Sequence, residues 1–352
     1  MITTLLFLLV LSILVFVHEL GHFLFAKLFK VRVDEFALGF PPRVFSFKKG
    51  ETVYALNALP LGGYVKIHGE NPEDGDVKGD KRNFQNINWI KQVIILSAGV
   101  IFNILFAWLL MSLTLFIGTS KIALDGVQDK YIEGPREVLI HQILADSPAD
   151  KAGIKAGDYV LEVNGSSTTG ITQVQESIKN SPQVFSVMIK NAFGATTTLQ
   201  VEKMENNTIG VGLAETAKVR MGILPSLYYG AQATYNLTGQ VFTGVIGFFG
   251  KLFTGNGSWE EVSGPVGIAK VVGTSSQEGF VSLLFVTILI SISLAAMNIL
   301  PFPALDGGRI VIAVLEGILR RKLPIKFVNA LNSIGFILLL TLMLVVTVKD
   351  II

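Results

Sequence analysis

The 352-residue chain contains no cysteine, and this absence excludes several kinds of chemistry. Without thiols there are no disulfides, no cysteine nucleophile and no metal site with cysteine ligands. Charged residues are also scarce, at 16% of the chain against about 25% in an ordinary soluble domain. The net charge is only +2, and no basic cluster is interleaved with aromatic residues, so nucleic acid is not an expected partner.

Hydrophobic residues, in contrast, make up 50% of the chain and gather in long uncharged runs. A helix needs roughly 18–20 such residues to cross a bilayer. The runs predict a polytopic α-helical membrane protein with four transmembrane segments, at 1–29, 92–120, 279–305 and 327–348. Residues 1–17 contain no Lys or Arg, unlike the start of a secretory signal peptide, so we expect the first helix to be retained.

The first hydrophobic segment carries three ionisable side chains, His18, Glu19 and His22. Placing a charged residue at the bilayer centre costs about 2.5–3.5 kcal/mol of free energy. Chance occurrence of these three residues is therefore a poorer explanation in a membrane span than in a soluble helix. His18 and His22 stand four residues apart on one helix face, where both rings can reach one Zn²⁺. Glu19 can reach a water at the metal without being a ligand. This H-E-x-x-H pattern is typical of zinc metalloproteases and predicts Glu19 as the catalytic residue.

A catalytic zinc site has three protein ligands and one open position. His68 and His141 lie in the loop and the domain that follow, where ordinary histidines are common. Asp306 follows the third span, and the first and third spans run in the same direction across the membrane. Pro301 and Pro303 break the helix before it, which frees backbone where a cavity can form. Asp306 is therefore the predicted third metal ligand.

The distribution of Lys and Arg predicts the orientation in the membrane. Residues 27–91 contain 11 of them and 306–326 contain five, whereas the much longer stretch 121–278 contains 12. By the positive-inside rule the first two segments are cytosolic, and 121–278 is extracytoplasmic together with both termini. The predicted active site then lies near the cytosolic side, and 306–326 is a cytosolic amphipathic connection.

Segment 217–278 is predicted to hold an amphipathic surface helix and a linker. Its uncharged part, 221–250, is interrupted by Gln, Thr and Asn, while its apolar residues recur at helical spacing. A fifth span is the alternative. It is less favoured because it would place Asp306 on the opposite side from the histidine pair.

Two further segments are predicted to form β-structure. Segment 30–91 is predicted to be a small cytosolic membrane-associated β-element, with strands at 31–40, 43–47, 52–59 and 64–67. It either pairs with an extended peptide or simply packs on the membrane surface. In 121–216 the run SPADKAGIKAGDYVLEVNG resembles a PDZ domain, an α/β fold that binds peptides or C-termini by strand addition. The resemblance places peptide binding at Ile209, Gly210 and Val211; a spacer that only shields the membrane site is the alternative.

Taken together, the motifs HELGH and NILPFPALDGG with a PDZ-like insert between them resemble the site-2 protease family. Within it the chain is similar to RseP-type bacterial regulated intramembrane zinc metalloproteases, here with one PDZ domain. The stretches EFALGFPP, LPLGGYVKIHGE and SGPVGIAK support the resemblance. It implies a multi-pass protein of the bacterial inner membrane, one Zn²⁺ per chain, and single-pass transmembrane substrates such as an anti-sigma factor or a remnant signal peptide.

The resemblance also implies that the β-element presents substrate as an extended strand. A transmembrane helix hides its carbonyls in internal hydrogen bonds, so it must unwind before water can attack. Asn298 and Asn103, amides in apolar helices, are candidates to hold the unwound backbone or, alternatively, to join helices. Two other classes of function remain open: a non-proteolytic PDZ scaffold with a structural zinc, and a zinc transporter. The transporter is disfavoured because the second and fourth spans lack ionisable groups.

Overall fold

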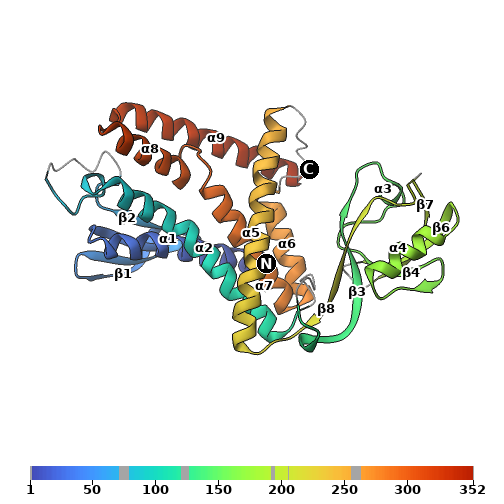
Figure 1. The fold of residues 1–352 in the computed structure, drawn as a ribbon. Coiled ribbons are helices and arrows are strands. Elements are labelled where there is room, and N and C mark those ends of the chain that lie inside the picture. The colour runs from blue at the N-terminus through green and yellow to red at the C-terminus, as the bar shows by residue number, and fades with distance from the viewer. Residues whose placement is uncertain are drawn as a thin grey trace. The chain divides into compact units, whose positions relative to one another are not determined.

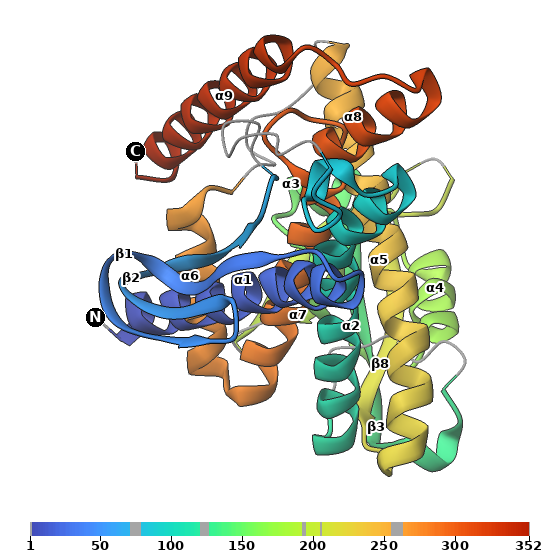
Figure 2. The same ribbon diagram turned by 90° about the vertical axis from the view of Figure 1, so that its left-hand side faces the viewer.

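The computed structural model describes residues 2–70, 79–119, 127–191, 195–204, 206–254 and 263–351. It divides into two compact units, Met1–Met111 with Thr234–Ile352, and Ser112–Ala233. Figures 1 and 2 show the elements of both units as ribbons. Parts of the predicted segments 30–91, 121–216 and 217–278, including the start of the PDZ-like segment, lie outside the described residues.

Four helices in the described part are long and apolar enough to cross a membrane. This number is the one predicted from the hydrophobic runs. The shortest has 19 residues, which at a rise of about 1.5 Å per residue matches a hydrocarbon core of about 30 Å. The four are α1 (Ile2–Leu28), α2 (Trp89–Ile117), α7 (Phe280–Asn298) and α9 (Ile325–Ile351).

Helix α5 (Ile223–Phe253) has 31 residues and is not among these four candidate spans. Its polar residues recur along its length, and the buried hydroxyls of Thr234 and Thr238 have no partner among the described residues. Helix α6 (Pro265–Glu278) precedes α7. That 221–250 lies on the membrane surface stays a prediction.

The predicted cytosolic β-element is a hairpin of β1 (Val33–Lys49) and β2 (Thr52–Ile67). The sequence breaks expected near Pro41 and Pro60 appear as bends with register shifts, because the antiparallel pairing continues past them. Residues 35–38 of β1 therefore pair with both halves of β2. Residues 63–67 pair with β1 on one side, and no other strand of the described sheet pairs with their second side, which is therefore an edge of the sheet.

The hairpin packs along α1, and both elements are drawn in blue in Figure 2. The ring of Phe36 lies 5.5 Å from that of Phe16 and 5.0 Å from that of Phe23, centre to centre. A buried cluster of Ala26, Val31, Val33, Ile67, Phe84, Ile95 and Leu96 joins the base of the hairpin to α2. The packing thus holds one edge of β2 beside the helix that carries the HELGH motif.

The second unit contains a six-stranded antiparallel sheet with strand order β7-β6-β4-β3-β8, and β5 pairs with β4. Its core includes Val138, Ile140, Val174 and Phe185. The predicted peptide-binding residues lie where β8 begins: Ile209 is buried, and Gly210 has φ +80°. That this unit is a PDZ domain stays a prediction. Its elements are β3 (Ile132–Ile143), α3 (Pro148–Lys151), β4 (Tyr159–Val163), β5 (Ser166–Ser167), α4 (Ile171–Asn180), β6 (Val184–Lys190), β7 (Thr196–Glu202) and β8 (Val211–Val219).

The chain between α7 and α8 (Asp306–Leu319) makes a tight turn that positions Asp306. Helix α7 ends at Asn298, before Pro301 and Pro303, because proline cannot continue the helical hydrogen-bond ladder. A Cβ on Gly308 would lie 2.8 Å from the carbonyl carbon of Phe302, so only glycine fits where α8 meets the turn. Asp306 is the first residue of α8, where the helix dipole favours a carboxylate.

Candidate metal centre and active site

Two of the predicted zinc ligands lie together on α1. His18 and His22 are both buried, at 8% and 7% exposure. Their Nε2 atoms are 3.2 Å apart, and the two rings are nearly perpendicular, at 82°. This arrangement follows from the helix itself, because side chains four residues apart project from the same face.

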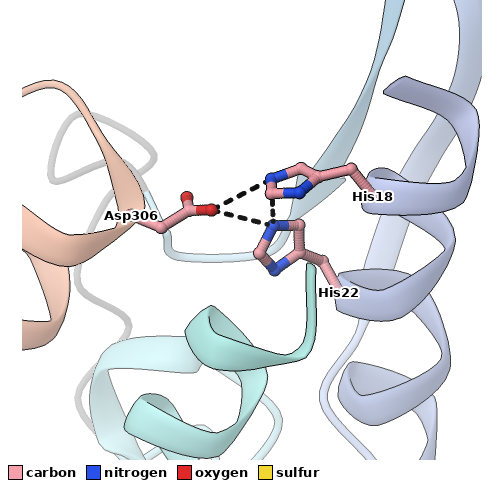
Figure 3. A group of neighbouring side chains, drawn as sticks. All are labelled: His18, His22 and Asp306. Carbon is pink, nitrogen blue, oxygen red and sulfur yellow. Dashed lines mark hydrogen bonds and ion pairs between the residues drawn. The ribbon is translucent and has the colours of Figure 1, made fainter. Parts of the chain in front are cut away.

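Asp306 reaches the histidine pair from the first turn of α8 (Figure 3). Its Oδ2 lies 3.0 Å from Nε2 of His18 and 3.3 Å from Nε2 of His22. The three side chains are the one group of this kind that the described residues contain.

The three donor atoms fit a zinc ion. Tetrahedral ligands at about 2.0–2.1 Å from Zn²⁺ stand about 3.3 Å from one another, and the observed separations are 3.0, 3.2 and 3.3 Å. Two imidazoles and one carboxylate are donors that Zn²⁺ accepts. Because the cluster holds three donors within the described chain, one tetrahedral position stays open, as catalytic sites require.

Helix α2 provides a hydrogen-bond partner for the ring of His22. Nδ1 of His22 lies 2.9 Å from the backbone carbonyl oxygen of Ile95, and both groups are buried. A carbonyl only accepts, so Nδ1 carries the proton and Nε2 keeps its lone pair toward the cluster. Such a partner fixes the orientation of a metal-binding histidine.

Glu19 lies beside the cluster but is not one of its three donors. Its Oε2 accepts a hydrogen bond of 3.0 Å from the backbone N–H of Val65. Val65 belongs to the edge of β2 that no other described strand pairs with, so the hairpin holds this carboxylate in place. The contact links the predicted catalytic residue to the predicted substrate-binding element.

Gly99 lets α2 approach the two histidine rings. A Cβ on this residue would lie 2.7 Å from Cε1 and 2.8 Å from Nε2 of His18, closer than real Cβ contacts. In an ordinary helix Gly→Ala stabilises by about 1 kcal/mol. Gly99→Ala is instead expected to displace the rings and to lower zinc content, measured by metal analysis of the purified protein.

Gly239→Ala is the matched control, because this glycine lies in α5 and, among the described residues beyond its own helix turn, a Cβ there would meet no atom within 4 Å. It is expected to keep the zinc content of the parent chain. Equal zinc in the Gly99 and Gly239 variants would show that the rings do not need the close approach of α2.

The remaining predicted residues are more dispersed. Asn103 is fully buried on α2 beside His18, with Nδ2 3.3 Å from Nδ1 of that ring. Asn298 is half-buried at the end of α7, and among the described residues no hydrogen bond joins it to the cluster. His68, which is not a predicted ligand, has its Nδ1 3.5 Å from Oδ2 of Asp34 and its Nε2 3.5 Å from Oδ2 of Asp80, and it is not part of the cluster. Sequence reasoning missed Ile95, Gly99 and Val65, whose contributions come from backbone groups or a missing side chain.

Four apolar helices and a His–His–Asp cluster beside a half-buried glutamate are features of a membrane-embedded metallohydrolase. The sequence matches Peptidase family M50 over residues 6–342, and the chain belongs to this family, which comprises the site-2 proteases. The protein is accordingly a zinc metalloprotease with Zn²⁺ as its cofactor.

Three relatives illustrate the similarity, and each bears the name "Putative zinc metalloprotease". One from Clostridium perfringens is 34% identical over 349 residues, covering 98% of this chain and 97% of that protein. One from Clostridium acetobutylicum is 34% identical and covers 97% and 95%. One from Fusobacterium nucleatum is 35% identical and covers 97% and 96%. The similarity therefore extends over both units of the fold.

Proposed function

We propose that this protein hydrolyses peptide bonds within or near the transmembrane segments of single-pass membrane proteins, with zinc held by His18, His22 and Asp306. The observation that carries the proposal is the cluster itself. Donor atoms from α1 and α8 lie at the spacing of zinc ligands, and Glu19 is beside them. Helix α1, which carries both histidines and Glu19, is apolar enough to span a bilayer. Regulated intramembrane proteolysis is the process that such a site serves.

When bound, zinc acts as a Lewis acid that activates water and polarises a peptide carbonyl. Glu19 acts as the general base, taking the proton of the attacking water and passing it to the leaving amine. Its hydrogen bond from the N–H of Val65 keeps one carboxylate oxygen fixed while the other remains for proton transfer. Burial of both histidines keeps bulk water from competing for their nitrogens.

The substrate binds as an extended strand along residues 63–67. This edge of β2 has no strand partner within the described sheet, and it lies beside Glu19. Because the N–H of Val65 already donates to Glu19, the substrate pairs with the other outward-facing backbone groups of the edge. Adding a strand to a free edge gives the substrate backbone hydrogen bonds in place of those that its helix loses. Strand addition would therefore stabilise the unwound substrate, whose peptide carbonyls are then accessible to water.

We place the protein in the bacterial inner membrane, with 27–91 and 306–326 in the cytosol and the PDZ-like unit outside. The Lys and Arg distribution supports this orientation. Ile209, Gly210 and Val211 lead into β8, an edge strand of its sheet, which is where a peptide or C-terminus would add. Peptide binding there would select substrates or control their entry.

The test is cleavage of a single-span protein by the purified chain in liposomes, with the cut located by mass spectrometry. We expect cleavage inside or next to the span, and faster cleavage when a Gly or Pro is placed in the span to ease unwinding. Cuts confined to soluble flanking sequence would contradict the proposal. Stable binding without any cleavage would favour the non-proteolytic scaffold instead.

A further inference from the structure

The side chain of Asn103 lies against the second nitrogen of a predicted zinc ligand. Asn103 is fully buried in α2, and its Nδ2 is 3.3 Å from Nδ1 of His18. Its backbone carbonyl accepts a hydrogen bond of 2.8 Å from the hydroxyl of Ser291, which ties this point of α2 to α7. The amide therefore sits at a junction of three membrane helices.

In the present orientation of the Asn103 amide, the contact with His18 brings two hydrogen-bond donors together. If Nε2 of His18 binds zinc, Nδ1 carries a proton and can only donate. Nδ2 of Asn103 also only donates, so two donors face each other. At the same time Oδ1 of Asn103 is buried with no hydrogen-bond partner among the described residues. A buried acceptor left unpaired costs about 1–3 kcal/mol.

A half-turn of the amide removes the contact between two donors and gives Oδ1 a partner, and Nδ2 then takes the buried place that Oδ1 held. The oxygen and nitrogen of an asparagine amide are nearly equal in size and shape, so the turn needs no change in packing. Oδ1 then faces Nδ1 of His18 and accepts a hydrogen bond from its N–H. Resting on the zinc site of the proposed function, we propose that Asn103 is a positioning residue that accepts this hydrogen bond and orients His18 toward the metal.

The opposite histidine supports this role, because it has an equivalent partner on the same helix. Ile95 and Asn103 are eight residues apart on α2, so they lie on one face, with Gly99 midway between them. The Ile95 carbonyl accepts from Nδ1 of His22. With the amide turned, Oδ1 of Asn103 does the same for His18, whose Nδ1 its amide already contacts. One face of α2 thus sets the tautomer of both rings, and the glycine between lets that face come close.

This assignment differs from the idea that Asn103 holds the unwound substrate backbone. A substrate-holding amide must present its polar atoms to an open site, whereas Asn103 is 0% exposed and directed at an imidazole. The two roles make different predictions. Loss of a substrate contact raises KM and leaves metal affinity unchanged, whereas loss of a partner to a ligand weakens metal affinity.

The experiment measures zinc affinity of the full-length purified protein by competition with a chelator, alongside kcat and KM. Asn103→Leu, which removes the acceptor at similar size, is expected to weaken zinc binding about 10–100-fold. Asn103→Asp, which keeps an acceptor oxygen, is expected to retain affinity within a few fold. Asn57→Leu is the control, since Asn57 is also buried and its Oδ1 has no partner among the described residues, but it lies in the hairpin. The zinc affinity of this variant should not change.

Asn103→Ala, judged by the same assay, replaces the leucine variant if that protein does not fold. Parental zinc affinity with a raised KM in either variant would overturn the proposal in favour of substrate holding. An equal loss in the leucine and aspartate variants would overturn it as well, because the acceptor would then not matter. His18→Ala separates this result from failure of the site itself: if it also keeps zinc, the proposed ligand set is wrong.

Discussion

Replacing Glu19 by glutamine is expected to leave zinc bound and to lower kcat for cleavage by about 10²–10⁴-fold, the usual contribution of a general base. The amide has nearly the same shape, and its oxygen can still accept from the N–H of Val65. It cannot take a proton from water. Zinc should stay because Glu19 is not among the three donors of the cluster. The measurement is cleavage of a single-span substrate in liposomes, with metal analysis of the same sample.

Glu316→Gln serves as the matched control for loss of a carboxylate. Glu316 lies in α8 and accepts from Nζ of Lys322 and the N–H of Leu323, at the end of the helix far from Asp306. Cleavage by this variant should stay near that of the parent chain. Undiminished cleavage by Glu19→Gln would remove Glu19 from the mechanism, whatever the zinc content.

Asp306→Ala is expected to weaken zinc binding by more than about 100-fold and to reduce cleavage to background. The physical reason is the loss of one of three protein donors, while changes to outer partners of metal ligands alone cost about 10–100-fold. The two remaining donors also lose the carboxylate that lies 3.0 and 3.3 Å from their Nε2 atoms. Chelator competition gives the affinity, and the liposome assay gives the activity.

The glutamate and aspartate variants check one another. If Asp306→Ala kept equimolar zinc, the third ligand would lie elsewhere. Glu19, which is adjacent to His18 in the chain, would be the candidate, and Glu19→Gln should then release the metal. Loss of zinc from Asp306→Ala with retention in Glu19→Gln separates the roles of ligand and base. Glu316→Ala, on the same helix as Asp306, should behave as the parent in both assays.

Some of the fold could be predicted because its signals are local. Four apolar runs correspond to α1, α2, α7 and α9, since a helix in lipid needs only length and hydrophobicity. The bounds were less predictable. Helix α7 ends at Asn298, several residues before the end of its apolar run, because the two prolines that follow stop the helix. The strands of the hairpin, in turn, run through positions where prolines and glycines suggested breaks.

The support around the candidate site had no signal in the sequence. A backbone carbonyl at Ile95 and a backbone N–H at Val65 belong to residues whose side chains are purely apolar. In the sequence nothing distinguishes Gly99 from the other glycines among the 35 of the chain. Only the structure shows that the rings of His18 and His22 lie close to it. The sequence shows Asn103 as an amide in an apolar helix, but only the structure shows that its side chain contacts His18.

By itself, the sequence determined the pair of imidazoles with a carboxylate beside them, because residues one and four apart on a helix have a known relation in space. It also determined which segments can lie in lipid. Only the tertiary structure brought the Asp306 carboxylate to that pair across 288 residues and set α2 and β2 against it. Such contacts depend on how helices and strands pack, and a helical or strand period carries no information about which distant element will fill a given face.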